Sequence, residues 1–358
     1  MRSLTRHCEP PGPAKGRPED RLREAIQRSF RAARLMDCFV AALLAMTVGF
    51  AIPAHAADAW PQRPIRFIVG FAPGGSADVL ARWLSDPVGR MLGQTIIVDN
   101  RPGGGGNLGM EMVAQSPPDG YTVGMGSVGA LITNQVLMAG KLPYNPETDL
   151  TPITQLASYP NVVAVHPSVP VKTMPELVTW LHAHPGEGYA IPGVGSSPHL
   201  VGEMLNHRFD LKLQQVPYRS GGPALSDLIS GQIRVMVDNA TTVFPPYADG
   251  RLRALGVAAP ERLAVMPDVP TLNEAFKVDD LDLTSWQGLF GPAKLPADIT
   301  DKLARAYADA LALPEVRERM TKVGAAPVSS TPAAFAAYVA RERPRWTKIA
   351  QDSGARLD

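Results

Sequence analysis

Cysteine is almost absent from this chain, which has only Cys8 and Cys38 in 358 residues. Both lie near the start, so the rest of the chain has neither a disulfide framework nor a cysteine-ligated metal site. The sequence also lacks His-Glu-x-x-His, a Gly-x-Ser-x-Gly nucleophile elbow and a Gly-Lys-Ser/Thr phosphate loop. These absences argue against the common zinc protease, serine hydrolase and P-loop classes, and we expect no metal and no cofactor.

Long hydrophobic runs are also missing, apart from Phe39 to Ile52. This run has about 14 residues, too few for a helix that spans a bilayer. A basic segment precedes it, and Ala54-His55-Ala56 follows with the small residues that a signal peptidase requires. We therefore expect residues 1–56 to be a signal peptide with a long n-region, cleaved near Ala56, and the mature protein to be exported. The alternative is a retained signal anchor.

The chain has no excess of positive charge, since its 35 Lys and Arg residues are balanced by 34 Asp and Glu residues. Nucleic acid is therefore not an expected partner. The part after residue 56 is long enough to bury a large core without disulfides, and we expect it to be a soluble monomer.

Short apolar segments alternate with helical ones after residue 64, which is the pattern of an α/β fold. The predicted strands are Ile65–Phe71, Thr95–Asp99, Tyr121–Gly126, Val162–His166, Tyr189–Gly193, Leu213–Pro217, Ile233–Val237 and Leu252–Ala258. The predicted helices are Ala77–Leu92, Asn107–Gln115, Met174–Ala183, His199–His207, Pro223–Ser230 and Thr242–Ala248. A strand-free helical tail follows: Ala297–Leu313, Pro314–Val323 and Thr331–Ser353. We expect two domains, with the tail packed on the first, and a kink or break at Pro87.

Glycine-rich turns join several of these strands to the next helix. The strand Ile65–Phe71 runs into Ala72-Pro73-Gly74-Gly75-Ser76-Ala77-Asp78, and similar turns occur at Gly193–Pro198 and Tyr218–Pro223. Such turns present backbone N–H groups at the positive end of a helix, which is an anion-binding arrangement. We expect helix starts from two halves of the chain to bind one small anion.

Each side chain beside these turns has two possible roles, one structural and one in ligand binding. His199 either packs beside the cleft or contacts the ligand, and Asp78 either stabilises its helix start and pairs with Arg82 or belongs to the site. Arg219 follows a strand, where α/β folds place ligands, and is either solvated or paired with a carboxylate. The serines of these turns are either helix caps or ligand contacts.

A run of four glycines also matches a dinucleotide-binding pattern. Gly104-Gly105-Gly106-Asn107-Leu108-Gly109 satisfies G-x-G-x-x-G. No acidic residue ends a later strand at the expected distance, so the match is weak. A glycine-rich turn that opens the helix Asn107–Gln115 is the favoured interpretation.

Five segments together resemble the Bug family, the periplasmic solute-binding proteins associated with tripartite tricarboxylate transporters. The resemblance runs from about Trp60 to the C-terminus, and it implies that the exported protein is periplasmic. The segments are Phe71-Ala72-Pro73-Gly74-Gly75-Ser76-Ala77-Asp78, Val98-Asp99-Asn100-Arg101-Pro102-Gly103-Gly104-Gly105-Gly106-Asn107, Ser116-Pro117-Pro118-Asp119-Gly120-Tyr121-Thr122, Val216-Pro217-Tyr218-Arg219-Ser220-Gly221-Gly222-Pro223-Ala224-Leu225 and Pro267-Asp268-Val269-Pro270-Thr271-Leu272.

This resemblance implies a two-lobed periplasmic binding protein of type II, a clamshell with two interlobe crossings. The first lobe would comprise residues 57–158 and 284–358, and the second residues 159–283. The crossings would lie near Gln155–Val165 and Leu281–Phe290.

The resemblance also implies that loops of both lobes hold a carboxylate, often through backbone groups and bridging waters. The implied ligand-binding residues are Phe71, Gly74, Gly75, Ser76, Asp78, Ser127, Val128, Gly129, Gly195, Ser196, Ser197, His199, Tyr218, Arg219, Gly221, Gly222 and Asp238. Two departures stand out: Ser220 replaces a frequent glycine, and Pro87 interrupts a helix that is usually continuous.

The implied function is a receptor, not an enzyme, that captures a small carboxylate and presents it to membrane transporter subunits. One alternative is a ligand-loaded partner of a membrane sensor. The other is a periplasmic hydrolase or lyase that uses His199 or Arg219. The sequence favours binding, because it supplies no nucleophile–base pair and no metal ligand set.

Overall fold

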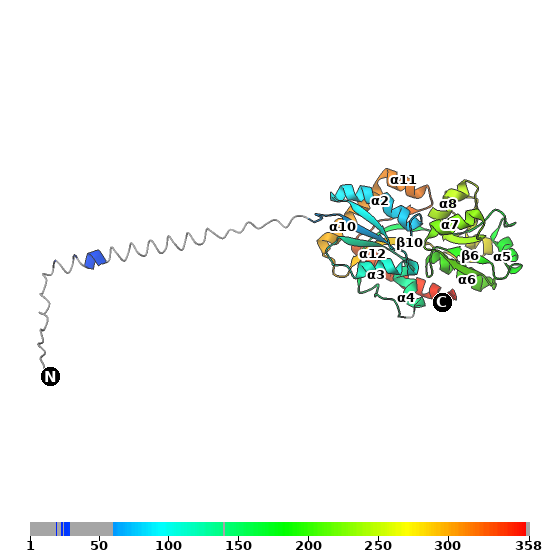
Figure 1. Ribbon diagram of the computed structural model, residues 1–358, viewed down its shortest axis with the longest axis horizontal. Coiled ribbons are helices and arrows are strands. Elements are labelled where there is room, and N and C mark those ends of the chain that lie inside the picture. Colours follow the sequence, from blue (N-terminus) through cyan, green and yellow to red (C-terminus); the bar gives the residue numbers. More distant parts are fainter. Residues whose placement is uncertain (1–18, 20–22, 24, 29–59, 139, 356–358) are drawn as a thin grey trace, which may run out of the picture. The chain divides into compact units, whose positions relative to one another are not determined.

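The computed structural model describes residues 19, 23, 25–28, 60–138 and 140–355. The chain divides into two units, Met1–Ala59 and Trp60–Asp358. Nearly all of the expected signal peptide, including its apolar run and the cleavage position near Ala56, lies outside the described residues. The second unit contains two β-sheets with helices packed around them (Figure 1).

The first sheet has six strands in the order β11-β4-β10-β3-β1-β2. Their bounds are β1 Ile65–Val69, β2 Ile96–Asn100, β3 Thr122–Ser127, β4 Leu150–Tyr159, β10 Ser285–Pro292 and β11 Ala326–Pro327. β1 pairs in parallel with β2 and β3, whereas β10 is antiparallel to both β3 and β4. The carboxyl ends of β1 and β3 therefore lie at one edge, where the glycine-rich turn after β1 begins.

The second sheet has five strands in the order β7-β6-β8-β5-β9. Their bounds are β5 Asn161–Val165, β6 Gly188–Ile191, β7 Gln214–Pro217, β8 Val235–Asn239 and β9 Arg253–Ala258. β6 runs parallel to β7 and β8, so the turns after these three strands lie at a common edge. β5 is antiparallel to β8 and β9.

Helices cover both sheets (Figure 1). Their bounds are α2 Ser76–Leu92, α3 Asn107–Ala114, α4 Asn134–Leu137, α5 Met174–His182, α6 Ser197–Phe209, α7 Gly221–Ser230, α8 Ala240–Ala248, α9 Leu272–Phe276, α10 Ala297–Ala312, α11 Pro314–Thr321 and α12 Pro332–Asp352, with short turns η1 Gly104–Gly106 and η2 Gly129–Thr133. The helices α10 and α12 pack against β4, and α10 also packs against α2. The tail therefore returns to the first sheet, as expected.

The predicted α/β class and all eight predicted strands are confirmed, with small shifts at their ends. Two central strands were missed, because the sequence around β4 and β10 was interpreted as crossings between domains. β4 does end at Tyr159, and after Pro160 alone β5 begins in the other sheet.

One expectation about the C-terminal helices is wrong, and the break allowed for at Pro87 does not occur. The C-terminal stretch is not free of strands, because it contains β11, which follows α11 and precedes α12 in the chain and pairs with β4. The helix α2 continues through Pro87 without a break. Leu84 and Val88 are fully buried on either side of Pro87, so packing holds the helix where one backbone hydrogen bond is lost.

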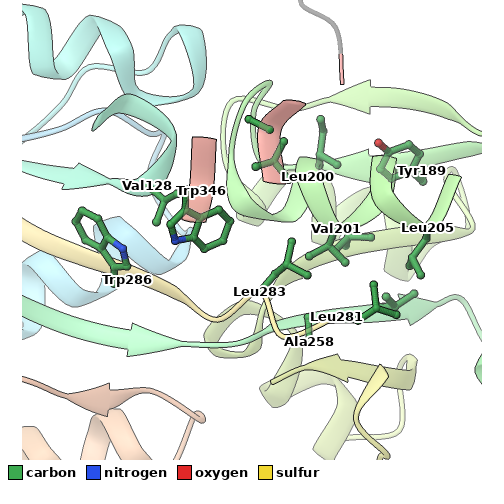
Figure 2. Close-up of a cluster of buried hydrophobic side chains, with 14 of the residues drawn as sticks. Val128, Tyr189, Leu200, Val201, Leu205, Ala258, Leu281, Leu283, Trp286 and Trp346 are labelled. Carbon is green, nitrogen blue, oxygen red and sulfur yellow. The ribbon is translucent and has the colours of Figure 1, made fainter. Parts of the chain in front are cut away.

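One apolar cluster extends across elements of both sheets (Figure 2). Trp286 from β10 and Trp346 from α12 are fully buried in it, as are Leu200 from α6 and Leu283 before β10. The two sheets therefore share part of their core, and the loops at their facing edges are held at close range. No helix among the described residues is long and apolar enough to cross a membrane.

Candidate functional site

A small cavity lies where loops from the two sheets meet, and the space open to the centres of water molecules in it is about 30 Å³. Residues of both sheets contribute to its wall. They are Phe71, Gly75, Ser76, Ala77, Ser127, Gly129, Tyr159, Pro192, Ser196, Ser197, Pro198, Ser220, Gly221, Asn239, Ser285 and Gln287.

Four of these residues are helix N-caps. Gly75 precedes α2, Ser196 precedes α6, Ser220 precedes α7 and Asn239 precedes α8. Only Ser196 caps its helix with its side chain, by accepting a hydrogen bond of 3.5 Å from the N–H of His199. The other three helices have no side-chain cap. In α8 the first N–H, that of Ala240, donates to the carbonyl of Pro160 at 3.0 Å, whereas the first N–H groups of α2 and α7 remain for another acceptor. Four positive helix ends therefore meet at one cavity.

No Lys, Arg, His, Asp or Glu is among the described residues that line this cavity. An anion in it is stabilised by the helix ends, since each N-terminus carries about half a positive charge. The described residues also contain no group of three or more His, Cys, Asp and Glu side chains that could hold a metal ion. The arrangement suits a carboxylate bound by backbone N–H groups.

A hydrogen-bonded network ties the two sheets together beside the cavity. Ser76 Oγ donates to Asn239 Oδ1 at 2.9 Å, and Asn239 Nδ2 donates to Asn161 Oδ1 at 2.8 Å. Ser197 Oγ also donates to Asn161 Oδ1, at 3.2 Å. The hydroxyl of Tyr159 is hydrogen-bonded to Ser76, and burial raises the pKa of this tyrosine, which stays neutral. These side chains are positioned by one another.

Asp238 and His199 lie outside the cavity lining, and both are buried. Burial raises the pKa of Asp238 to about 7. Its Oδ1 accepts a hydrogen bond of 2.6 Å from the N–H of Asn239, while Oδ2 is packed against Gly221. Burial lowers the pKa of His199 to about 4, and its Nδ1 accepts from the N–H of Gly195 at 3.1 Å. The imidazole therefore fixes its own loop and is poorly suited to act as a catalytic base.

Asp78 does not line the cavity, but it stabilises the glycine-rich turn before α2. Its carboxylate accepts hydrogen bonds from the N–H of Gly74 at 3.0 Å, from Arg82 Nε at 3.0 Å and from Asn100 Nδ2 at 3.0 Å. Burial favours a raised pKa, but the hydrogen bonds from Arg82, Gly74 and Asn100 outweigh it and hold the pKa of Asp78 below its usual range. The carboxylate thus anchors the glycine turn that begins α2.

The side chains of Tyr218 and Arg219 do not line the cavity. Tyr218 donates its hydroxyl to Asp227 Oδ2 at 2.7 Å. Arg219 is exposed, and its carbonyl accepts a hydrogen bond of 3.0 Å from the N–H of Ala72, which joins turns of the two sheets. Arg219 therefore contributes a backbone contact between the two sheets, and neither side chain belongs to the cavity wall.

Of the residues that the sequence predicted, the structure brings eight into the cavity wall: Phe71, Gly75, Ser76, Ser127, Gly129, Ser196, Ser197 and Gly221. The other predicted residues lie behind or beside it: Gly74, Asp78, Val128, Gly195, His199, Tyr218, Arg219, Gly222 and Asp238. The predicted ligand-binding residues do not include Ala77, Tyr159, Pro192, Pro198, Ser220, Asn239, Ser285 and Gln287, although Ala77, Pro198 and Ser220 lie in the predicted loops and Asn239 directly follows Asp238. Several of these adjoin predicted positions, but Tyr159, Ser285 and Gln287 belong to the two missed strands.

Glycines allow the loops of the two sheets to touch. A Cβ on Gly105 would lie 2.1 Å from the carbonyl oxygen of Val194, and one on Gly195 would lie 1.6 Å from Asn134 Oδ1. Thr133 Oγ1 donates a hydrogen bond of 2.6 Å to the carbonyl of Gly195. The glycine run at residues 103–106 therefore serves as a contact surface, in agreement with the favoured reading of a turn before α3.

Comparisons with known proteins agree with this geometry. Residues 80–355 match the model of the tripartite tricarboxylate transporter family receptor. Protein BugT of Bordetella pertussis is 33% identical over 312 residues, which are 87% of this chain and 95% of BugT. A structure described as a periplasmic transporter is 35% identical with a TM-score of 0.80 and covers 84% of this chain and 100% of its own.

Two further solved structures contain ligands. Rpa4515 of R. palustris, solved with adipate, is 31% identical with a TM-score of 0.79, and the match covers 83% of this chain and 100% of Rpa4515. MatC of Rhodopseudomonas palustris, solved with bound malate, is 33% identical with a TM-score of 0.77, and the match covers 81% of this chain and 100% of MatC. Both ligands are small carboxylates.

Proposed function

We propose that this chain, which belongs to the tripartite tricarboxylate transporter receptor family, captures a small organic acid in the cavity and presents it to the membrane subunits of such a transporter. The family consists of periplasmic solute-binding receptors, so the chain is a binding protein and not an enzyme. The observation that carries the proposal is the meeting of four helix N-termini at a cavity without cationic side chains. The adipate and malate of the two relatives support a carboxylate as the ligand.

In this proposal the N–H groups at the starts of α2 and α7 bind the same carboxylate. Gly75 and Gly221 both line the cavity and lie side by side in its wall, since a Cβ on Gly75 would lie 3.2 Å from the backbone nitrogen of Gly221. Residues behind the wall hold these loops in place, as Asp78 does for Gly74. The remaining predicted residues are proposed to act in the same indirect way, through backbone and packing.

We also propose that ligand binding brings two lobes together, with residues 57–158 and 284–358 in one and residues 159–283 in the other. Two features support these boundaries: Pro160 alone separates β4 from β5, and β10 re-enters the first sheet at Ser285. Hinge motions usually occur at a few residues at the ends of such elements. Export, with cleavage near Ala56, and a monomeric mature protein complete the proposal.

A thermal-shift screen of organic acids tests the proposed function. The panel comprises mono-, di- and tricarboxylates, with the corresponding amides as uncharged controls. A ligand present at 100 times its dissociation constant stabilises the fold by about 2.7 kcal/mol, so a true ligand raises the melting temperature by several degrees. We expect at least one carboxylate to do so and its amide to have no effect. A panel in which no carboxylate shifts the transition contradicts the proposal.

A further inference from the structure

Two polar side chains in the cavity wall have a buried atom without a hydrogen-bond partner among the described residues. These atoms are Ser220 Oγ and Gln287 Oε1. Ser220 is 1% exposed and Gln287 is 3% exposed. Folded proteins give hydrogen-bond partners to the large majority of buried side-chain polar atoms, so each exception requires an explanation. Because both residues line the cavity, a bound molecule is placed to supply the missing partners.

Three neighbouring polar side chains already have partners. Ser76, Ser197 and Asn239 line the same cavity, and each is hydrogen-bonded within the network around Asn161. These side chains build the wall. Ser220 and Gln287 belong to the same wall, and Ser220 Oγ and Gln287 Oε1 have no partner in it.

Ser220 occupies a position where serine usually serves its own helix. It is the N-cap of α7 and has an extended backbone, with φ −173° and ψ 175°, yet its hydroxyl makes no capping hydrogen bond. Ser196, at the matching position of α6, does accept from the first turn. An N-cap serine normally satisfies one of the free N–H groups of its helix. The hydroxyl of Ser220 is therefore available for a ligand.

Gln287 lines the cavity from the first sheet, whereas Ser220 belongs to a loop of the second. Gln287 lies on β10, paired with Ser127 of β3, in the interior of the first sheet. Its side-chain oxygen is an acceptor and needs a donor. A ligand between Ser220 and Gln287 thus meets one hydroxyl, which can donate or accept, and one carbonyl oxygen, which only accepts.

The chemistry of these two groups selects among ligand groups. An ionised carboxylate has no proton to donate to Gln287 Oε1, and a methylene group neither donates nor accepts. An ammonium group can donate, but the four helix N-termini disfavour a cation, and no described lining residue is a carboxylate that compensates for it. A hydroxyl group is neutral, and it both donates and accepts.

We propose that Ser220 and Gln287 bind a hydroxyl group of the ligand, so that this chain prefers hydroxylated carboxylates to the same acids without the hydroxyl. The inference rests on the proposed function, because it concerns the same cavity. A site built to bind a hydroxyl group rejects the analogue that lacks it, since its buried polar groups are then left unpaired.

Matched pairs of acids test this preference by isothermal titration calorimetry. Three pairs differ by one hydroxyl group: L-malate and succinate, citrate and propane-1,2,3-tricarboxylate, lactate and propionate. We expect the hydroxylated member of at least one pair to bind at least ten times more tightly than its partner. Ser220→Ala should reduce that ratio at least threefold, and Ser220→Gly should do the same. Ser226→Ala is the matched control, because Ser226 lies on the exposed side of the same helix, and it should leave the ratio unchanged.

The outcomes separate this inference from the proposed function. Equal affinities within every pair, a preference for the acid without a hydroxyl, or a ratio that Ser220→Ala does not change overturns the inference while the receptor function stands. If the protein binds only acids without a hydroxyl group, such as adipate, the inference is also overturned and the receptor function stands. Failure of every carboxylate, in this panel and in the wider screen, overturns both.

Discussion

The carbonyl oxygen of Val194 lies so close to Gly105 that a Cβ on the glycine would stand 2.1 Å from it. Gly105 belongs to η1, beside the first sheet, and Val194 belongs to the loop between β6 and α6 of the second sheet. The backbone of Gly105 also has a positive φ of 65°, which L side chains adopt at a cost. This contact limits how closely the two sheets approach, and only glycine permits the observed approach.

Gly105→Ala should therefore impede lobe closure. We expect ligand affinity to fall at least tenfold, and small-angle scattering of the variant to show little decrease in the radius of gyration on adding ligand. Gly93→Ala is the control, because Gly93 has a φ of 71° and a Cβ added there would meet no atom of the described residues within 4 Å. Both alanines cost about 1 to 2 kcal/mol of backbone strain, so a loss of closure in both variants, or in neither, would contradict this role for Gly105.

The backbone N–H of Gly75 is expected to matter more for binding than the side chain of Arg219. Gly75→Pro removes a donor at the cavity wall, whereas Gly75→Ala adds a Cβ and keeps the N–H. Calorimetry should show the largest loss of affinity for Gly75→Pro and a smaller one for Gly75→Ala, with melting temperatures confirming that both variants fold. Arg219→Ala should cost about 1 kcal/mol or less, as expected for an exposed charge. The reverse order would mean that a salt bridge carries recognition.

Asp238 should make stability depend on pH. Burial raises the pKa of its carboxyl from 3.8 to about 7. Between about pH 4 and pH 7 the folded chain keeps a proton that the unfolded chain has released, so this group lowers the free energy of unfolding as the pH rises through that window. Above about pH 7 both states are ionised, and its contribution becomes constant.

Asp238→Asn removes this dependence. Relative to the wild type, the free energy of unfolding of the variant should rise between about pH 4 and pH 7, by up to about 4 kcal/mol. Urea denaturation at a series of pH values measures the difference, and Asp309→Asn, at an exposed position of α10, serves as the control. A difference between Asp238→Asn and the wild type that stays constant over this range would contradict the assignment.

The sequence predicted the loops that line the cavity better than the strands that line it. The turns before α2, α6 and α7 were found because glycine, proline and serine mark strand-to-helix junctions locally. β10 was missed because all its residues are buried, which removes the alternating pattern, and because Gly288, Gly291 and Pro292 are untypical of strands.

The cavity role of Gln287 depends on distant pairing. It reaches the site because β10 pairs with β3, where Gln287 is opposite Ser127, and with β4, whose last residue Tyr159 also lines the cavity. These contacts join segments far apart in the sequence, so no local pattern contains them. Asn239 is different, since it directly follows the predicted residue Asp238 and a search of helix N-caps would have identified it.

The central claim is that helix N-termini, and not a cationic side chain, bind the carboxylate. A crystal structure of the protein with the tightest acid from the screen tests it most directly. We predict a carboxylate in the cavity, with its oxygens about 2.7 to 3.2 Å from backbone nitrogens at the starts of α2 and α7, directly or through one water. A carboxylate paired with the guanidinium of Arg219, or bound outside this cavity, would contradict the account.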